Sequence, residues 1–140
     1  MCIRDSYYYN RHKFHYIGVT WHETHGRILV VISCNGDWPE SKLSVPAIDI
    51  ISVGDSVELG MEVDNANMNF CYREPGSRSS KNSDWQTIPH TLDASIISDE
   101  AGRGEHASFT GAFVGVAAFD ITGGALIADF NYFHYAPKAK

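Results

Sequence analysis

The alternation of apolar and polar residues between Ser56 and Tyr72 constrains the fold of this chain more than any other feature. From residue 57 to residue 63 every second residue is apolar: Val57, Leu59, Met61 and Val63. After the polar stretch Asp64–Asn67, the apolar positions resume with the same period at Met68, Phe70 and Tyr72. A period of two is that of a strand with one buried face, and a polar stretch between two such runs is typical of a turn. The segment is therefore predicted to be a pair of antiparallel strands.

Two other segments repeat this organisation. Residues 14–22 alternate, Glu23–Gly26 supply a turn, and residues 27–34 return as a run that is apolar on both faces. Farther along, Phe109–Tyr135 contains two β-rich runs joined by Thr122-Gly123-Gly124, which predicts a hairpin. No window combines a 3.6-residue apolar period with helix caps. The 140 residues are therefore predicted to form one all-β domain, a sandwich or a barrel.

Three segments, in order along the chain, resemble one known family. They are YYYN followed by FHYIGVTW (residues 7–10 and 14–21), the segment from Trp85 to Glu100, and FTGAFVG followed by ADFNYFHY (residues 109–115 and 128–135). Together they resemble the C-terminal domain of the β-xylosidases and α-L-arabinofuranosidases of glycoside hydrolase family 43. The resemblance implies a two-sheet antiparallel jelly-roll sandwich of the concanavalin A-like type. It also implies that the sandwich is incomplete at its N-terminus, because that family's domain begins upstream of the YYN strand.

This organisation divides the chain into three parts. Residues 1–6, MCIRDS, are interpreted as a leader of sequencing or assembly origin, because they resemble neither a signal peptide nor the start of the strand that follows. Residues 7–136 are predicted to be the sandwich, and residues 137–140 a tail. With such a leader the N-terminus assigns no compartment, and the lack of an Asn-x-Ser/Thr sequon slightly favours a bacterial cytoplasmic protein.

Composition excludes several classes of partner. The formal net charge of −6, with scattered Lys and Arg, argues against a nucleic-acid partner. No apolar run approaches membrane-spanning length, so no membrane association is expected. The three cysteines, Cys2, Cys34 and Cys71, have no metal-ligand spacing, and we expect neither a metal nor a cofactor.

Two acidic or histidine motifs invite a catalytic interpretation, and both are incomplete. His22-Glu23-Thr24-His25 has one residue too few for a zinc-protease motif and occupies a predicted turn. Glu62-Val63-Asp64 resembles the start of the strand motif of sandwich glucanases, but Asn67 stands where that motif needs a second glutamate. The chain by itself is therefore predicted to be non-catalytic, and a sandwich-fold glucanase stays a lesser alternative.

The aromatic residues carry the remaining functional hypotheses. If several of them lie exposed in a row on one sheet face, the chain is a free-standing carbohydrate-binding module; otherwise most of them fill the core. In the family that this chain resembles, a loop of the C-terminal domain brings a phenylalanine to the sugar pocket. Phe109 matches that residue best and is the one expected substrate-binding residue; Phe113 is the weaker choice because it should already lie in the strand.

The resemblance implies a role in a larger enzyme. The sandwich would be an accessory domain packed on a catalytic β-propeller that is absent from these residues. The parent enzyme would remove xylose or arabinose from xylo- or arabino-oligosaccharides with inversion, and the substrate would lie at the domain junction. Members of the family are commonly oligomers, so a homo-oligomeric parent is expected.

Overall fold

The structure is a computed structural model of the whole chain and is all-β. It describes residues 2–10, 12–36, 42–46, 48–75, 84–98, 101, 111–120, 123 and 127–137. In these ranges the elements are, in chain order, β1 (Cys2–Asn10), β2 (Lys13–His22), β3 (Gly26–Asn35), β4 (Leu43–Ser44), β5 (Glu58–Asp64), β6 (Asn67–Arg73), β7 (Gln86–Asp93), the 3-10 helix η1 (Ala94–Ile96) and β8 (Phe113–Phe119). The alternating segment is a strand pair as predicted, with Asp64 opposite Asn67 at the turn.

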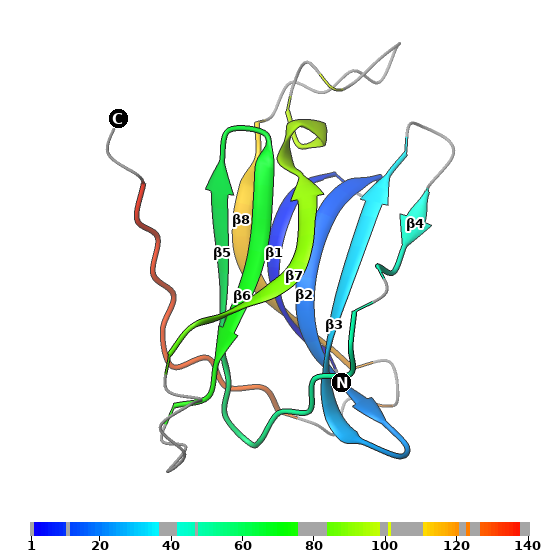
Figure 1. Cartoon of the computed structure of the whole chain (residues 1–140), viewed down its shortest axis with the longest axis vertical. Coiled ribbons are helices and arrows are strands. Elements are labelled where there is room, and N and C mark those ends of the chain that lie inside the picture. Colours follow the sequence, from blue (N-terminus) through cyan, green and yellow to red (C-terminus); the bar gives the residue numbers. More distant parts are fainter. Residues whose placement is uncertain are drawn as a thin grey trace.

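The strands form two antiparallel sheets that lie one over the other (Figure 1). Sheet A has five strands in the order β4-β3-β2-β1-β8, and sheet B has three in the order β5-β6-β7. The β2–β3 pair is in continuous register from Lys13–Asn35 to His22–Gly26, which confirms the hairpin expected there. The predicted two-sheet antiparallel architecture is confirmed.

The core lies between the two sheets and is built by the alternation. Its buried side chains come from both inner faces: Ile17, Leu29 and Val31 from sheet A; Met68, Phe70, Ile88 and Leu92 from sheet B; and Val53 and Ala94 from the segments beside them. The apolar row of β5 packs against this cluster as the sequence indicates, with Leu59, Met61 and Val63 partly buried. Burying one face of each sheet is the main term that stabilises such a sandwich.

The predicted hairpin of Phe109–Tyr135 is wrong. Its first half contains β8, but β8 pairs with β1 over seven residue pairs, from Cys2–Phe119 to Tyr8–Phe113. The described part of its second half, residues 127–137, contains no strand and passes beside β5 (Figure 1). The turn residues Thr122 and Gly124 lie outside the described residues. The Gly-Gly turn signal predicted a local partner for this strand, but the strand instead pairs with one more than a hundred residues earlier in the chain.

The N-terminal strand begins earlier than the sequence indicates. β1 starts at Cys2, and Ile3 is paired on one side with Val19 and on the other with Ala118. A strand between two neighbours gains backbone hydrogen bonds on both edges, so residues with weak strand signals are still held extended. The expectation that MCIRDS does not start the strand is therefore wrong, while the origin of residues 1–6 stays a prediction.

Candidate functional site

A cluster of charged and aromatic side chains lies at one end of the outer face of sheet B. Because Leu59 and Phe70 point into the core, the neighbours Glu58 and Gly60 of β5 and Arg73 of β6 point outward. Arg73 directs Nε and Nη2 at the same carboxylate oxygen of Glu58, with the Nε hydrogen bond at 3.0 Å. The pair is more than a lone surface ion pair because an aromatic ring and a hydroxyl join it.

Trp85 supplies the ring. The guanidinium carbon of Arg73 lies 4.8 Å from the ring centroid, a cation–π geometry. Gly60 leaves room for the ring, because a Cβ at that position would come within 2.9 Å of Trp85 Cζ3 and 2.8 Å of Cys71 Sγ. Arg73 thus already covers one face of the Trp85 ring, although Trp85 keeps 45% of its surface exposed.

Tyr132 supplies the hydroxyl and attaches the C-terminal segment to sheet B. Burial alone would raise the pKa of the Glu58 carboxyl, but hydrogen bonds from Arg73 and Tyr132 and the charge of Arg73 hold that pKa below its usual range. The same hydrogen bond to Glu58 raises the pKa of the Tyr132 phenol. Glu58 is therefore ionised and fully engaged, which suits a structural contact and not a general acid.

The other carboxylates of β5 do not form a catalytic pair. Glu62 and Asp64 are exposed, and Asp64 Oδ1 accepts a hydrogen bond from the side chain of its neighbour Asn65 at 3.2 Å. A pocket with a volume of about 280 Å³ lies elsewhere, between β3 and residues 45–50. Its lining is apolar apart from Asp49. Neither Glu62 nor Asp64 lines this pocket.

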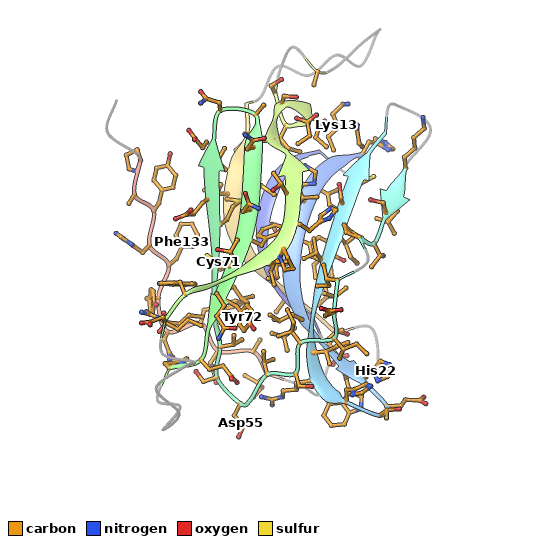
Figure 2. All side chains as sticks on the ribbon, viewed as in Figure 1. Lys13, His22, Asp55, Cys71, Tyr72 and Phe133 are labelled. Carbon is orange, nitrogen blue, oxygen red and sulfur yellow. The ribbon has the colours of Figure 1, made fainter. Side chains whose placement is uncertain are left out.

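His22 and His25 lie in a solvated turn, as expected. Nδ1 of His22 accepts hydrogen bonds from the backbone N–H groups of Thr24 and His25 at 3.2 and 3.3 Å. Figure 2 shows His22 at one end of the molecule and Lys13, at the start of β2, at the other. The ring of His22 therefore organises the β2–β3 turn. Among the described residues no three His, Cys, Asp or Glu side chains gather into a group that would hold a metal ion.

A buried histidine, His15, was missed by the sequence analysis. It belongs to the inward row of β2 with Ile17, and its side chain is 1% exposed. Its Nε2 lies 3.0 Å from the backbone oxygen of Asp93, and its Nδ1 lies 2.8 Å from Ser33 Oγ. A carbonyl oxygen only accepts, so Nε2 carries the proton and Nδ1 accepts from the Ser33 hydroxyl. Extending the alternation of β2 by one step would have placed His15 inside.

Ser33, His15 and Asp93 do not form a catalytic triad. The carboxylate of Asp93 caps η1, where Oδ1 accepts from the N–H of Ser95 at 2.9 Å and from its hydroxyl at 2.6 Å. Only the backbone of Asp93 reaches the histidine, and Ser33 is 8% exposed. Burial lowers the pKa of His15 against the opposing effect of Asp93. The group is a neutral hydrogen-bonded link between the two sheets.

Phe109, the one expected substrate-binding residue, lies outside the described residues. Phe113 is described; it begins β8, as the sequence predicted, but its side chain is 55% exposed and not in the core. Trp21 lies on the same face of β2 as Ile17 but is 69% exposed near the β2–β3 turn. Cys34 and Cys71 are free thiols, of which Cys34 is buried. No described helix is long and apolar enough to cross a lipid bilayer.

Comparisons with known proteins cover nearly the whole chain. The family model described as "Beta xylosidase C-terminal Concanavalin A-like domain" matches residues 6–136. The chain is 38% identical to "Xylosidase/arabinosidase 43B" of Humicola insolens over 93% of its own length and 24% of that protein's. It is 31% identical to "Beta-xylosidase" of Bacillus subtilis (strain 168) over 94% of its own length and 23% of that protein's. The chain thus spans about a quarter of the length of these relatives.

A solved structure shows the same fold. The crystal structure of xylan beta-1,4-xylosidase from Bacillus halodurans C-125 superposes with a TM-score of 0.70 at 23% identity. The match covers 88% of this chain and 25% of that one. At this identity the likeness concerns the fold alone, and it agrees with the concanavalin A-like sandwich implied by the sequence resemblance.

Proposed function

The chain belongs to the family of beta-xylosidase C-terminal concanavalin A-like domains, and on this premise we propose that it is the accessory sandwich of a larger xylan-degrading glycosidase. One observation carries the proposal: relatives named as xylosidases or arabinosidases match over 93–94% of this chain but only 23–24% of themselves. The carboxylates of β5 agree with it, because Glu58 is bound by Arg73 and Glu62 and Asp64 are exposed, whereas a glycosidase needs two carboxyl groups that face each other across the substrate.

In this proposal the sandwich packs on a catalytic β-propeller supplied by the rest of the parent enzyme. The propeller carries both catalytic carboxylates, and the substrate is a short xylo- or arabino-oligosaccharide at the domain junction. Phe109 reaches the rim of the sugar pocket, where its ring excludes water and supports the sugar. The parent assembles as a homo-oligomer.

The experiment is Phe109→Ala in the full-length enzyme, with Phe70→Ala as the matched core control. At Phe109 we expect kcat/KM to fall while the unfolding midpoint and the pH profile stay unchanged, because the ring contacts substrate and transfers no proton. Phe70 is 1% exposed, so its truncation should cost about 3–5 kcal/mol of stability. If Phe109→Ala behaves like Phe70→Ala, Phe109 is a core residue and not part of the pocket.

A free-standing carbohydrate-binding module is the second candidate. It is favoured by the exposure of Trp85 (45%) and Tyr132 (61%), which both contact the Glu58–Arg73 pair. The first candidate is preferred because Arg73 already occupies the Trp85 ring. The test is electrophoresis of the chain in a native gel that contains xylan. Retardation that Trp85→Ala abolishes would support the binding module over the accessory domain.

A further inference from the structure

The outer face of sheet A is apolar where a solvated sheet would be polar. Ile17 of β2 and its cross-strand partner Val31 of β3 both point into the core. The residues that alternate with them along each strand therefore point outward. The outward positions, called here the apolar face, are Phe14, Tyr16, Gly18 and Thr20 on β2, Ile28, Val30, Ile32 and Cys34 on β3, and Phe113, Gly115, Ala117 and Phe119 on β8. None of these twelve residues is charged. On β1, which lies between β2 and β8, the register puts Arg4, Ser6 and Tyr8 at the matching positions, so the face has one charged position.

The outer face of sheet B has the opposite chemistry. Its outward positions on β5 and β6 are Glu58, Gly60, Glu62, Asp64, Asn67, Asn69, Cys71 and Arg73. Four of these eight residues are charged, as expected for the solvated side of an antiparallel sheet. The two outer faces of one sandwich therefore differ sharply. Alternation of polar and apolar residues keeps sheet B wet, whereas sheet A has apolar residues on both of its faces.

The apolar face is accessible mainly along β8. Phe113 and Phe119, at the two ends of β8, are 55% and 45% exposed. Val30 and Ile32 of β3 are partly exposed, while Cys34 on the same strand and Tyr16 and Gly18 on β2 are buried. Large exposed aromatic side chains on a surface with a single Arg position are the composition of an interface core, because Lys, Glu and Asp are depleted there while aromatic residues and Arg are enriched.

The length of the relatives identifies the occupant. About three quarters of each relative lies outside the part that this chain matches. A body on the same polypeptide reaches a neighbouring surface at high effective concentration, which favours it over a second copy of the chain. In addition, Phe113 follows Phe109 closely in the sequence, so the apolar face adjoins the segment that the proposed function directs to the sugar pocket.

We propose that the apolar face is the surface on which the sandwich docks against the catalytic part of its parent enzyme. This inference rests on the proposed function and adds which of the two sheets faces the partner. Sheet B, with the Glu58–Arg73–Trp85 cluster, then faces solvent. The partner surface is apolar and supplies side chains that cover Phe119 and the β3 row.

The test places a charge on each face of the full-length enzyme. Phe119→Glu and Val30→Glu lie on the apolar face; Glu62→Lys and Thr91→Glu, at exposed positions of β5 and β7, are the matched controls. Docking of an uncompensated charge requires its desolvation, so we expect the apolar-face variants to raise the undocked fraction about tenfold or more. The readouts are the rate of limited proteolysis between the two parts and the division of one thermal transition into two. The controls should change neither.

Two further measurements keep the outcomes distinct. Phe119→Glu in the isolated chain should leave its circular dichroism spectrum unchanged, since that side chain is half exposed there. If the spectrum shows that this variant does not fold, Val30→Glu alone tests the proposal. Undocking by the sheet B controls and not by the apolar-face variants would overturn the inference and leave the proposed function intact. A change in oligomer size with the two parts still docked would overturn it in favour of a second copy. A parent gene without a catalytic part would remove the proposed function itself.

Discussion

At the scale of single residues, His15 shows how a polar group becomes part of this core. It lies in a row that alternation assigns to the interior, and it satisfies both ring nitrogens there, one from Ser33 of sheet A and one from the backbone of Asp93 at the end of β7. The inward direction is readable from the sequence. Its partner is not, because Asp93 is 78 residues away and only the packing of the two sheets brings it near.

This arrangement predicts that the chain loses stability in mild acid. The pKa of folded His15 lies below the ordinary value of 6.5, so between these two pKa values the unfolded state binds more protons than the folded state. The contribution is therefore complete above pH 6.5 and is lost as the pH falls through the lowered pKa. The measurement is the free energy of unfolding by urea between about pH 7.5 and about pH 5.

The control is His15→Gln, which keeps a hydrogen-bonding side chain but does not titrate. It should be less stable than the parent chain at neutral pH and should lose less stability on acidification. Glu58 does not confuse the comparison, because its lowered pKa places its effect below pH 4.5. Equal pH dependence of the two chains would show that His15 is not the responsible group.

At the scale of elements, the strands with a clean period of two were predictable and the long-range pairing was not. The alternation of β5 and β6 and the β2–β3 turn follow directly from the residues. The Gly123 turn signal, in contrast, suggested a local hairpin for a strand that pairs with β1 at the other end of the chain. A hydrophobic pattern identifies a strand and its buried face, but it does not show which other strand it pairs with.

The segment Ile127–Pro137 is predicted to be held to sheet B chiefly through Tyr132. Tyr132→Phe removes the hydroxyl that donates to Glu58 and should make this segment more susceptible to chymotrypsin, while global stability falls by at most about 1 kcal/mol because the contact is solvated. Tyr135→Phe is the matched control, because Tyr135 is 66% exposed on the same segment. If both variants are cleaved at the rate of the parent chain, other contacts hold the segment.

At the scale of the whole molecule, the described strands form the two-sheet sandwich that the sequence predicted. The sandwich was predictable because period-two strands are a local property of the sequence. The apolar outer face of sheet A was only partly predictable. Residues 27–34 are visibly apolar on both faces, but the contribution of β8 to that surface depends on the unexpected β1–β8 pairing.

The isolated chain is predicted to hydrolyse no glycoside. Glu58 is held ionised by Arg73, Glu62 and Asp64 are exposed, and Asn67 stands opposite Asp64. Incubation with aryl xylosides, aryl arabinosides and β-glucans should give only the rate of the buffer. Activity that disappears in Glu62→Gln or Asp64→Asn would instead establish a sandwich-fold glucanase.

The two sheets are unequal, and this difference bears on how the chain behaves alone. Sheet A has five described strands and sheet B three. Val116 of β8 lies on the side that faces sheet B, yet it is 42% exposed, so the described strands leave that part of the inner surface uncovered. Together with Phe113 and Phe119 on the outer side, β8 exposes apolar side chains on both faces. Exposed apolar surface and unpaired strand edges promote association.

We therefore predict that the 140-residue chain alone associates at micromolar concentration or folds loosely. A partner that covers Val116 and Phe119 would remove apolar surface that otherwise drives self-association. The measurements are sedimentation velocity and reversible thermal unfolding. Phe119→Glu separates the two sources of association, because it changes only the outer side of β8. A sharp, reversible transition of a monomeric chain would contradict the prediction.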